Sequence, residues 1–316
     1  MIGTRIVDGH EAITLLSYEA ELEAAFVPEA GMVGCSLLHR GEELLGQRGG
    51  LAAYVAERST MGIPLLHPWA NRLGERRFEV WGRAVDLAAA EPPPSEDPNG
   101  LPIHGLLSAA PGWRVVRRDA TGEGGKIEAR FDFAAYPGLI RAFWFPHEIG
   151  LEVTLTVRTL TIATSVEATG DGPVPVSFGF HPYLQLPGVD RGDWEIEIPV
   201  RERLLLDERM LPTGAREATS VAGGPLGSRT FDDAYVAPPT GERFAVAGGG
   251  RRIEVAFESG FPFAQVYAPN DDDVIAIEPM TAPTNALVAA PGELCTAEPG
   301  HPFRSVFSIT VTDAGG

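Results

Sequence analysis

Polar and apolar residues alternate along several stretches of the chain, and this alternation is its clearest structural signal. In residues 151–157, leucine and valine alternate with charged residues and threonine. Four other stretches repeat the pattern: 127–133, 194–198, 253–257 and 307–312. Because successive side chains of a strand point to opposite faces, each stretch predicts a strand with one buried face.

Few segments have the period of a helix. The two short candidates are Tyr18–Phe26 and Leu51–Glu57. Turn signals such as Pro111-Gly112 and Pro137-Gly138 separate the strand-like runs instead. Closely spaced strands without regular helices between them are typical of an antiparallel sandwich, not of a parallel α/β sheet. Since no repeat and no linker is visible, we expect one domain over residues 1–316.

The composition fits a large core with many turns. Hydrophobic residues make up 44% of the 316 residues, and the chain contains 37 glycines and 27 prolines. The net charge of -18 opposes binding to nucleic acid, because contact with phosphates needs a basic surface. The two cysteines, Cys35 and Cys295, are too few for a disulfide framework.

The N-terminal residues and the hydropathy of the chain bear on its location. The first residues, MIGTRIVDGHEA, lack the basic and apolar regions of a signal peptide. No stretch approaches the roughly 18 apolar residues of a membrane span. We therefore expect a cytoplasmic protein with no membrane partner. The Pro-rich segment 91–100 predicts a surface excursion, and the aspartates of 269–273 predict a solvated turn because the spacing of a calcium loop is missing.

Seven histidines are candidates for acid/base chemistry, and their local context separates them. His181 ends an apolar, aromatic run just before Pro182, where a strand end would present it to a loop region suited to proton transfer. His104 lies between Gly and Pro residues that hold the backbone. For both, a structural role is an equal interpretation on local sequence, and for His67 the structural role is favoured. The other four lie in polar or turn contexts and are not expected in a site: His10, His39, His147 and His301.

Polar residues in apolar or Pro-rich surroundings are the remaining candidates. Glu278 ends the apolar run 274–277, where a buried carboxylate is costly unless it is paired or functional. Partial burial would raise its pKa and make it a stronger base, although a Glu just beyond the sheet edge is an equal interpretation. Asn71 and Arg72 are suited to hydrogen-bond a polyhydroxylated ligand. Asp232 and Asp233 are adjacent, so on a strand only one of them faces a given site.

Common metal, nucleotide and hydrolase motifs are absent from the sequence. No HxxxH, HExxH or CxxC spacing occurs. The chain also lacks GxSxG, a GxGxxG after a strand, and a P-loop. We therefore expect neither a metal nor a cofactor.

Five segments in order along the chain resemble the aldose 1-epimerase (galactose mutarotase) family. Each segment alone is weakly specific, but five in the family's order are strongly so. The matching segments span most of the chain: Gly62-Ile63-Pro64-Leu65 through His67-Pro68-Trp69-Ala70-Asn71-Arg72-Leu73, Ile103-His104-Gly105-Leu106, Phe178-Gly179-Phe180-His181-Pro182-Tyr183, Phe231-Asp232-Asp233-Ala234-Tyr235 and Ile277-Glu278-Pro279-Met280-Thr281.

The resemblance implies a fold and a role for several residues. The fold would be a β-supersandwich of mostly antiparallel strands, mainly β with few short helices. His181 matches the family's general acid, Glu278 its general base, and His104 a second histidine that hydrogen-bonds the sugar. Arg72 and one aspartate of the Asp232-Asp233 pair match binders of sugar hydroxyls, and we select Asp233.

The implied activity is the interconversion of the α and β anomers of a free aldose. Opening a hemiacetal ring needs one proton removed and another delivered, so an acid and a base suffice. The partner would be a small monosaccharide, and the protein a monomer or homodimer. A hexose-6-phosphate mutarotase ranks second, because its pattern favours Trp-Pro-Trp where this chain has His67-Pro68-Trp69. A non-catalytic carbohydrate-binding protein on the same fold is the third alternative.

Overall fold

A computed structural model describes residues 1–313, and its strands pair antiparallel in three large sheets. The N-terminal sheet has five strands that follow one another in sequence order, each joined to the next by a short connection. Their bounds are β1 (Ile2–Val7), β2 (His10–Ser17), β3 (Leu22–Val27), β4 (Val33–His39) and β5 (Glu42–Glu43).

The largest sheet has nine strands and includes the C-terminal strand at its centre. Its strands contain most of the alternating stretches of the sequence. In spatial order they are β11 (Arg114–Ala120), β12 (Gly124–Asp132), β13 (His147–Thr156), β14 (Thr159–Ala168), β28 (Phe303–Asp313), β24 (Arg251–Ser259), β23 (Phe244–Gly248), β18 (Glu195–Glu197) and β21 (Gly224–Pro225).

The third large sheet carries the residues of the candidate site. In spatial order it contains β20 (Pro212–Ala218), β19 (Glu202–Leu206), β22 (Phe231–Val236), β25 (Phe263–Ala268), β26 (Ile275–Met280), β16 (Gly179–Phe180) and β6 (Leu65–Leu66), with β17 (Tyr183–Leu184) also paired to β26. Three strand pairs lie outside these sheets: β7 (Arg77–Val80) with β8 (Arg83–Asp86), β9 (Ser95–Glu96) with β10 (Pro102–Ile103), and β15 (Val174–Val176) with β27 (Cys295–Ala297). The α-helices of the described chain are short: α1 (Gly50–Glu57), α2 (Pro137–Ile140) and α3 (Ala286–Ala289).

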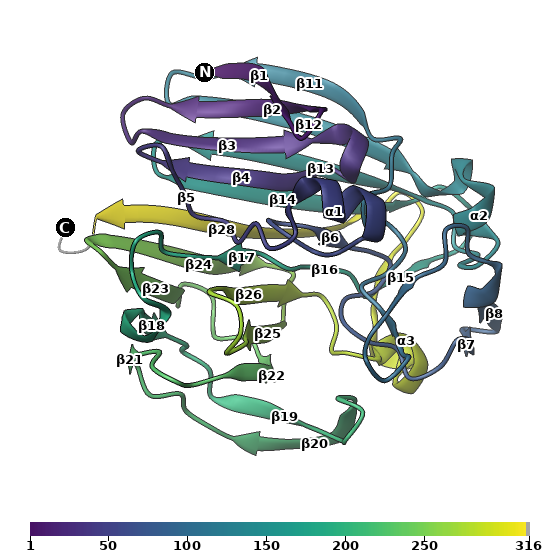
Figure 1. Cartoon of the computed structure of the whole chain (residues 1–316). Coiled ribbons are helices and arrows are strands. Elements are labelled where there is room, and N and C mark those ends of the chain that lie inside the picture. Colours follow the sequence, from purple (N-terminus) through teal and green to yellow (C-terminus); the bar gives the residue numbers. More distant parts are fainter. Residues whose placement is uncertain (314–316) are drawn as a thin grey trace.

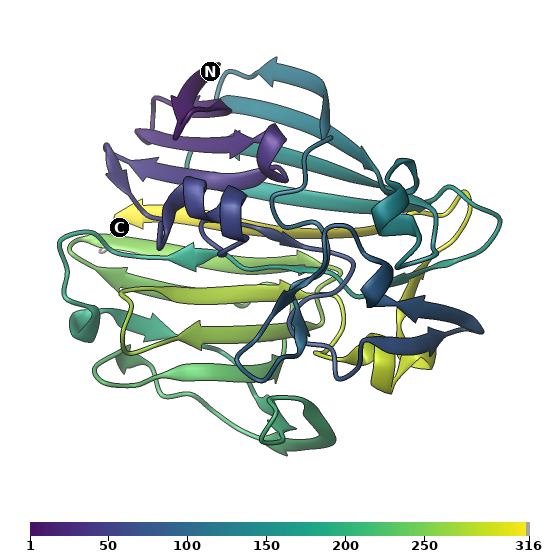
Figure 2. The same ribbon diagram turned by 45° about the vertical axis from the view of Figure 1, so that its right-hand side comes forward.

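The sheets stack in two layers (Figures 1 and 2). The five-stranded sheet packs on the β12–β13 half of the nine-stranded sheet. The eight-stranded sheet packs on the other half, where the ring of Phe180 lies 4.9 Å from that of Phe307 on β28. Buried side chains from all three sheets join in one hydrophobic cluster, and Leu15, Val153 and Ile309 are among those that are fully buried. The predicted β-supersandwich of antiparallel strands is therefore confirmed.

The predicted elements mostly match the structure. The alternating stretches 127–133 and 151–157 lie in β12 and β13 except for their last residues, and 194–198 centres on β18. The stretches 253–257 and 307–312 lie within β24 and β28, and the predicted helix Leu51–Glu57 is α1.

The predicted helix Tyr18–Phe26 is wrong, because the chain turns there and then enters β3. The alanines and leucine of this segment favour a helix locally. In the fold, however, Leu22 and Ala24 are completely buried, and β3 pairs on both sides, with β2 and β4. Burial and pairing on two sides therefore override the local helical preference.

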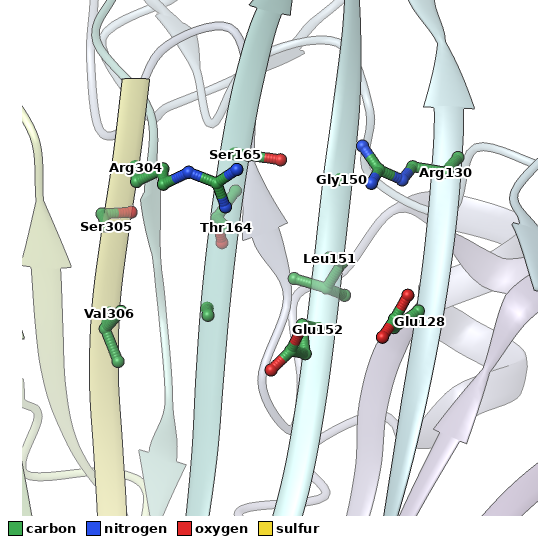
Figure 3. Close-up of a pocket in the computed structure, with 11 residues that line it drawn as sticks. Glu128, Arg130, Gly150, Leu151, Glu152, Thr164, Ser165, Arg304, Ser305 and Val306 are labelled. Carbon is green, nitrogen blue, oxygen red and sulfur yellow. The ribbon is translucent and has the colours of Figure 1, made fainter. Parts of the chain in front are cut away.

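The outer face of the nine-stranded sheet has a shallow hollow (Figure 3). One row of paired residues crosses four strands there, namely Arg130, Gly150, Ser165 and Arg304. Gly150 has no side chain, and Arg130 and Ser165 reach over it, since a Cβ there would lie 2.8 Å from Arg130 Nη1 and 2.5 Å from Ser165 Oγ. Acidic side chains occupy the neighbouring rows: Glu128, Glu148 and Glu152. Charges of both signs therefore alternate on this face, as they do on a solvated sheet surface.

Among residues 1–313, no helix is both long and apolar enough to cross a bilayer.

Candidate active site

A polar cavity of about 170 Å³ lies on the face of the eight-stranded sheet that points away from the nine-stranded sheet. Strands β17, β22, β25 and β26 supply part of its wall, His181 between β16 and β17 supplies another, and segments from the first third of the chain supply the rest. The cavity is lined by Arg48, Thr60, Asn71, Arg72, Ile103, His104, His181, Tyr183, Asp232, Tyr267 and Glu278.

Glu278 projects into this cavity from β26, a strand whose other residues are buried. The side chain itself is 2% exposed, and its Oε2 atom has no hydrogen-bond partner in the described chain. Burial raises the pKa of Glu278 well above its ordinary value, and the charge of Asp232 raises it further, while Arg72 opposes both effects. Glu278 therefore brings a buried carboxylate with one unpartnered oxygen to the cavity wall.

His181 follows β16 and is held where Pro182 interrupts the strand. Its backbone N–H donates to the carbonyl of Pro64, and its ring stacks on Tyr183 with centroids 4.0 Å apart. The Nε2 atom lies 3.1 Å from Glu278 Oε1. Burial, followed by the neighbouring His104, lowers the pKa of His181 well below its ordinary value.

The His181–Glu278 pair is consequently a buried acid and base in direct contact. Burial disfavours the charged form of each group, so the pKa values move toward each other. Such a pair titrates as a unit, and its shared proton can lie on either the nitrogen or the oxygen. When that proton lies on His181, the site presents an imidazolium and a carboxylate side by side.

His104 and Asn71 come from two loops that the backbone holds in unusual conformations. Both residues have positive φ, 63° at His104 and 57° at Asn71. The N–H of His104 donates to the carbonyl of Asn71 at 3.0 Å, which ties the loops together. The ring of His104 stands edge-on to His181, with centroids 5.4 Å apart. Burial, with Arg72 and Arg48 nearby, lowers the pKa of His104 to about 3, so the ring is neutral.

Gly105, next to His104, is required by this arrangement. Its φ is +76°, and a Cβ there would lie 2.2 Å from the carbonyl oxygen of His67. Only glycine tolerates both the left-handed conformation and the close approach.

Arg72 is positioned by two carboxylates. Its Nε lies 2.8 Å from Asp97 Oδ2, and its Nη2 lies 3.5 Å from Asp232 Oδ2. The Asp97 side chain is 1% exposed and also accepts from the N–H groups of Asn99 and Leu101. Burial tends to raise the pKa of Asp97, but these hydrogen bonds and Arg72 outweigh it and lower the pKa. The Pro-rich excursion 91–100 thus carries a buried carboxylate that orients a cavity arginine.

The selection of Asp233 is corrected by the structure, which places Asp232 in the cavity. Asp232 pairs in register with Tyr267, which also lines the cavity, and accepts from Gln265 Nε2 at 2.6 Å. Asp233 is on the opposite face of β22 and pairs with Arg203 at 3.3 Å. The two aspartates were indistinguishable in sequence, because the pairing of β22 with β25 decides which face each one takes.

His67 and His147 form a buried pair outside the cavity. Their Nε2 atoms are 2.7 Å apart, and His147 Nδ1 contacts the carbonyl of Phe145. His147 was predicted at a turn but begins β13 and is completely buried. The backbone carbonyl of His67 accepts from the N–H groups of Leu106 and Leu107, so this segment supports the His104 loop.

The other histidines also lie apart from the cavity, which none of His10, His39 and His301 lines. Conversely, the sequence assigned no role to several residues that do line it: Arg48, Thr60, Tyr183 and Tyr267. Alternation along β25 places Tyr267 on the same face as Gln265, which was a usable signal. Arg48 lies in a glycine-rich turn before α1 and had no local signal.

In the part of the chain that the structure describes, no group of three His, Cys, Asp or Glu side chains has the geometry to hold a metal ion.

Solved structures with the same architecture include a mutarotase-like protein and two epimerases or epimerase homologues. A galactose mutarotase-like protein from Clostridium acetobutylicum is 18% identical, with a TM-score of 0.85 over 99% of this chain and 98% of the other. Galactose 1-epimerase from Lactobacillus acidophilus is 14% identical, with a TM-score of 0.76 over 99% of each chain. An aldose epimerase homologue from C. elegans is 16% identical, with a TM-score of 0.74 over 99% of each chain. At these identities the likeness is one of fold.

The family of the chain is shown by comparing its sequence with the patterns of known protein families. The pattern of the aldose 1-epimerase family matches residues 30–310, most of the chain. None of the curated proteins matches the chain significantly. The chain belongs to the aldose 1-epimerase family, as its ordered segments predicted.

Proposed function

We propose that the protein is a mutarotase that interconverts the α and β anomers of an aldose. The observation that carries this proposal is the contact between His181 Nε2 and Glu278 Oε1, 3.1 Å apart in a polar cavity. In a cyclic hemiacetal, the ring oxygen and the anomeric hydroxyl are bonded to the same carbon. An acid and a base that act on these two oxygens must therefore lie close together, as this pair does.

In the proposed reaction, Glu278 removes the proton of the anomeric hydroxyl. The electron pair of that O–H bond forms the carbonyl π bond, and the bond between the anomeric carbon and the ring oxygen breaks. The ring oxygen takes the proton of His181. Rotation about the adjacent carbon–carbon bond exposes the other face of the aldehyde, and closure with the roles reversed yields the opposite anomer. The shared proton of the pair supplies the acid, and burial keeps Glu278 basic.

The remaining cavity residues are suited to hold the sugar. Arg72 presents N–H donors, Asn71 presents a side-chain amide, and Asp232 presents a carboxylate that accepts from hydroxyls. His104 is neutral at physiological pH, so it can both donate to and accept from a sugar oxygen. Tyr267 offers an aromatic face at the same wall. None of these groups needs to change charge during the reaction.

A hexose-6-phosphate mutarotase is the second candidate, and one observation favours it. That activity calls for at least two arginines near the sugar, and Arg48 and Arg72 both line the cavity. Each of them is paired with a carboxylate, Arg48 with Asp272 at 3.0 Å and Arg72 with Asp97 at 2.8 Å. The pairing weakens the case for a phosphate, so we place the free aldose first.

Exchange NMR with freshly dissolved α-glucose, α-galactose and glucose 6-phosphate tests the proposal. We expect anomer exchange well above the buffer rate with a free aldose. Glu278→Gln should reduce this rate by at least about 100-fold, because general base catalysis contributes factors of about 100 to 10,000. Glu19→Gln, at an exposed turn, is the matched control and should keep the wild-type rate.

Three outcomes of this experiment would contradict the proposal or change it. Exchange with glucose 6-phosphate alone would favour the second candidate. Saturable sugar binding without exchange would identify a binding protein. A rate unaffected by Glu278→Gln would remove Glu278 from the role of base.

A further inference from the structure

Arg48 occupies a place in the cavity wall that the acid/base chemistry does not explain. Its Nη1 atom donates to the hydroxyl of Tyr183 at 3.0 Å, and its guanidinium lies over the Tyr183 ring, 4.9 Å from the centroid. The Tyr183 hydroxyl is also 2.7 Å from Thr60 Oγ1. The Nε atom of Arg48 donates to Asp272 Oδ2 at 3.0 Å. Arg48 is therefore held on two sides, by the stack beneath it and by an aspartate outside the cavity.

The charge of Arg48 reaches the reacting end of the cavity. Tyr183 stacks directly on His181, and the positive charge of Arg48 adds to burial in lowering the pKa values of His181 and His104. Its remaining nitrogen, Nη2, has no hydrogen-bond partner within residues 1–313. Arg48 lines the cavity, so Nη2 is a donor that the hydrogen bonds of Arg48 leave unused there.

Asp272 comes from the turn between β25 and β26, a segment that the acid/base site does not otherwise use. It is one of three consecutive aspartates, and its two neighbours, Asp271 and Asp273, are exposed. The Asp272 side chain is 34% exposed and Arg48 is 28% exposed, so the pair lies at the rim and not in the core.

Both arginines of the cavity have a nearby carboxylate. Arg72 lies between Asp97 and Asp232, and Arg48 is paired with Asp272. A carboxylate or phosphate on the sugar would therefore meet arginines that are already neutralised, next to the negative charge of Asp232. A hydroxyl needs only a donor and an acceptor, which the arginines and the carboxylate of Asp232 offer.

We propose that the Arg48–Asp272 ion pair is a specificity determinant that makes the cavity select neutral aldoses over aldoses with an anionic substituent. This inference rests on the proposed function and adds the substrate class to it. Asp272 keeps the guanidinium of Arg48 in place as a donor to hydroxyls while cancelling its attraction for a second anion. Without the aspartate, the same guanidinium would become a binding group for a carboxylate or phosphate.

The test measures anomer exchange of glucose, glucuronate and glucose 6-phosphate by NMR in four proteins. These are the wild type, Asp272→Asn, Asp271→Asn and the double variant Arg48→Gln/Asp272→Asn. Asp271→Asn removes the same charge from the same turn without breaking the ion pair, so it controls for the general field of the loop. Binding of each sugar to all four proteins is measured in parallel by calorimetry.

We expect the wild type to prefer glucose to both anionic sugars. Asp272→Asn should shift the ratio of kcat/KM toward at least one anionic sugar by about tenfold, the size of one added charge-assisted hydrogen bond. Asp271→Asn should leave the ratio within about twofold of the wild type. The double variant should lose the gain, because the guanidinium that receives the anion is gone.

Other results would overturn the inference. An equal shift in Asp272→Asn and Asp271→Asn would show that only the net charge of the loop matters. A gain that survives in the double variant would exclude Arg48 as the receiving group. If no protein exchanges any aldose, the proposed function fails, and the calorimetric ratios still test the ion pair. If glucose is exchanged but the ratios do not move, the inference alone fails.

Discussion

The buried His67–His147 pair should make the fold lose stability as the pH falls below neutral. His67 is 4% exposed and His147 is 0% exposed, and a 2.7 Å hydrogen bond joins their Nε2 atoms. Burial lowers the pKa of His147 to about 4. Burial, and then the neighbouring His147, lowers the pKa of His67 well below its ordinary value. The folded protein therefore keeps both rings neutral at pH values where the unfolded chain protonates them.

The direction and size of the effect follow from proton linkage. A histidine whose folded pKa is lowered contributes stability above its unfolded pKa and loses that contribution as the pH falls below it. With an unfolded pKa of about 6.5, protonation stabilises the unfolded chain by about 1.4 kcal/mol per histidine at about pH 5.5 and by about 0.1 kcal/mol at about pH 7.5. The pair should therefore remove about 2.7 kcal/mol between these two pH values, a large share of the roughly 5–15 kcal/mol of a typical fold.

Urea unfolding at both pH values measures this loss. His147→Gln removes one of the two groups, so its free energy of unfolding should fall by about 1.4 kcal/mol less than that of the wild type over the same interval. His301→Gln, at an exposed turn, is the matched control. Glu278, with its raised pKa, acts in the opposite direction in all three proteins, so the comparison uses differences between them. Equal pH dependence in His147→Gln and His301→Gln would refute the argument.

Three further predictions concern the cavity and its supports. In thermal unfolding, Gly105→Ala should lower the free energy of unfolding by about 3 kcal/mol or more, because the added Cβ would lie 2.2 Å from the His67 carbonyl oxygen. Gly214→Ala is the control, since Gly214 has a similar φ of +86° and open space around it, and it should lower the free energy of unfolding by only about 1 kcal/mol. In Asp97→Asn, Arg72 loses its buried partner, so KM for the sugar should rise more than kcat falls, and the fold should be destabilised by about 3 kcal/mol. A lowered kcat with unchanged KM would argue against a positioning role for Asp97. The pH profile of kcat/KM should be bell-shaped, with an acid limb where the His181–Glu278 pair takes a second proton and an alkaline limb where the pair loses the shared one. A profile with a single limb would contradict the shared proton.

Much of the fold could be predicted from the sequence, because a strand with one buried face produces a local alternation of polar and apolar residues. Alternation at 151–157 and 307–312 reflects strands with one face in a core, and those stretches became β13 and the central strand β28. The helix prediction for Tyr18–Phe26 was wrong for a related reason. Both faces of β3 are buried, so its sequence does not alternate and its composition is helix-like.

The acid/base pair could also be anticipated, because both residues conflict with their local sequence. Glu278 is a carboxylate in an apolar strand, and His181 stands where Pro182 stops a strand. Local sequence left each with an equal structural interpretation, and only the ordered family segments favoured the catalytic one. The structure adds the contact between them, 3.1 Å across the cavity wall.

Other parts of the site depend on tertiary structure alone. The choice between Asp232 and Asp233 is a question of which face each takes, and the register with β25 settles it, because a shift of one residue exchanges the faces. Asp97 orients Arg72 across 25 positions of sequence, and Arg48 meets Asp272 across 224. The sequence by itself predicted the main strands, the protein family, and His181 and Glu278 as residues with either a structural or a catalytic role. Which charges meet was decided by the fold, since electrostatic partners are set by distance in space and leave no period along the chain.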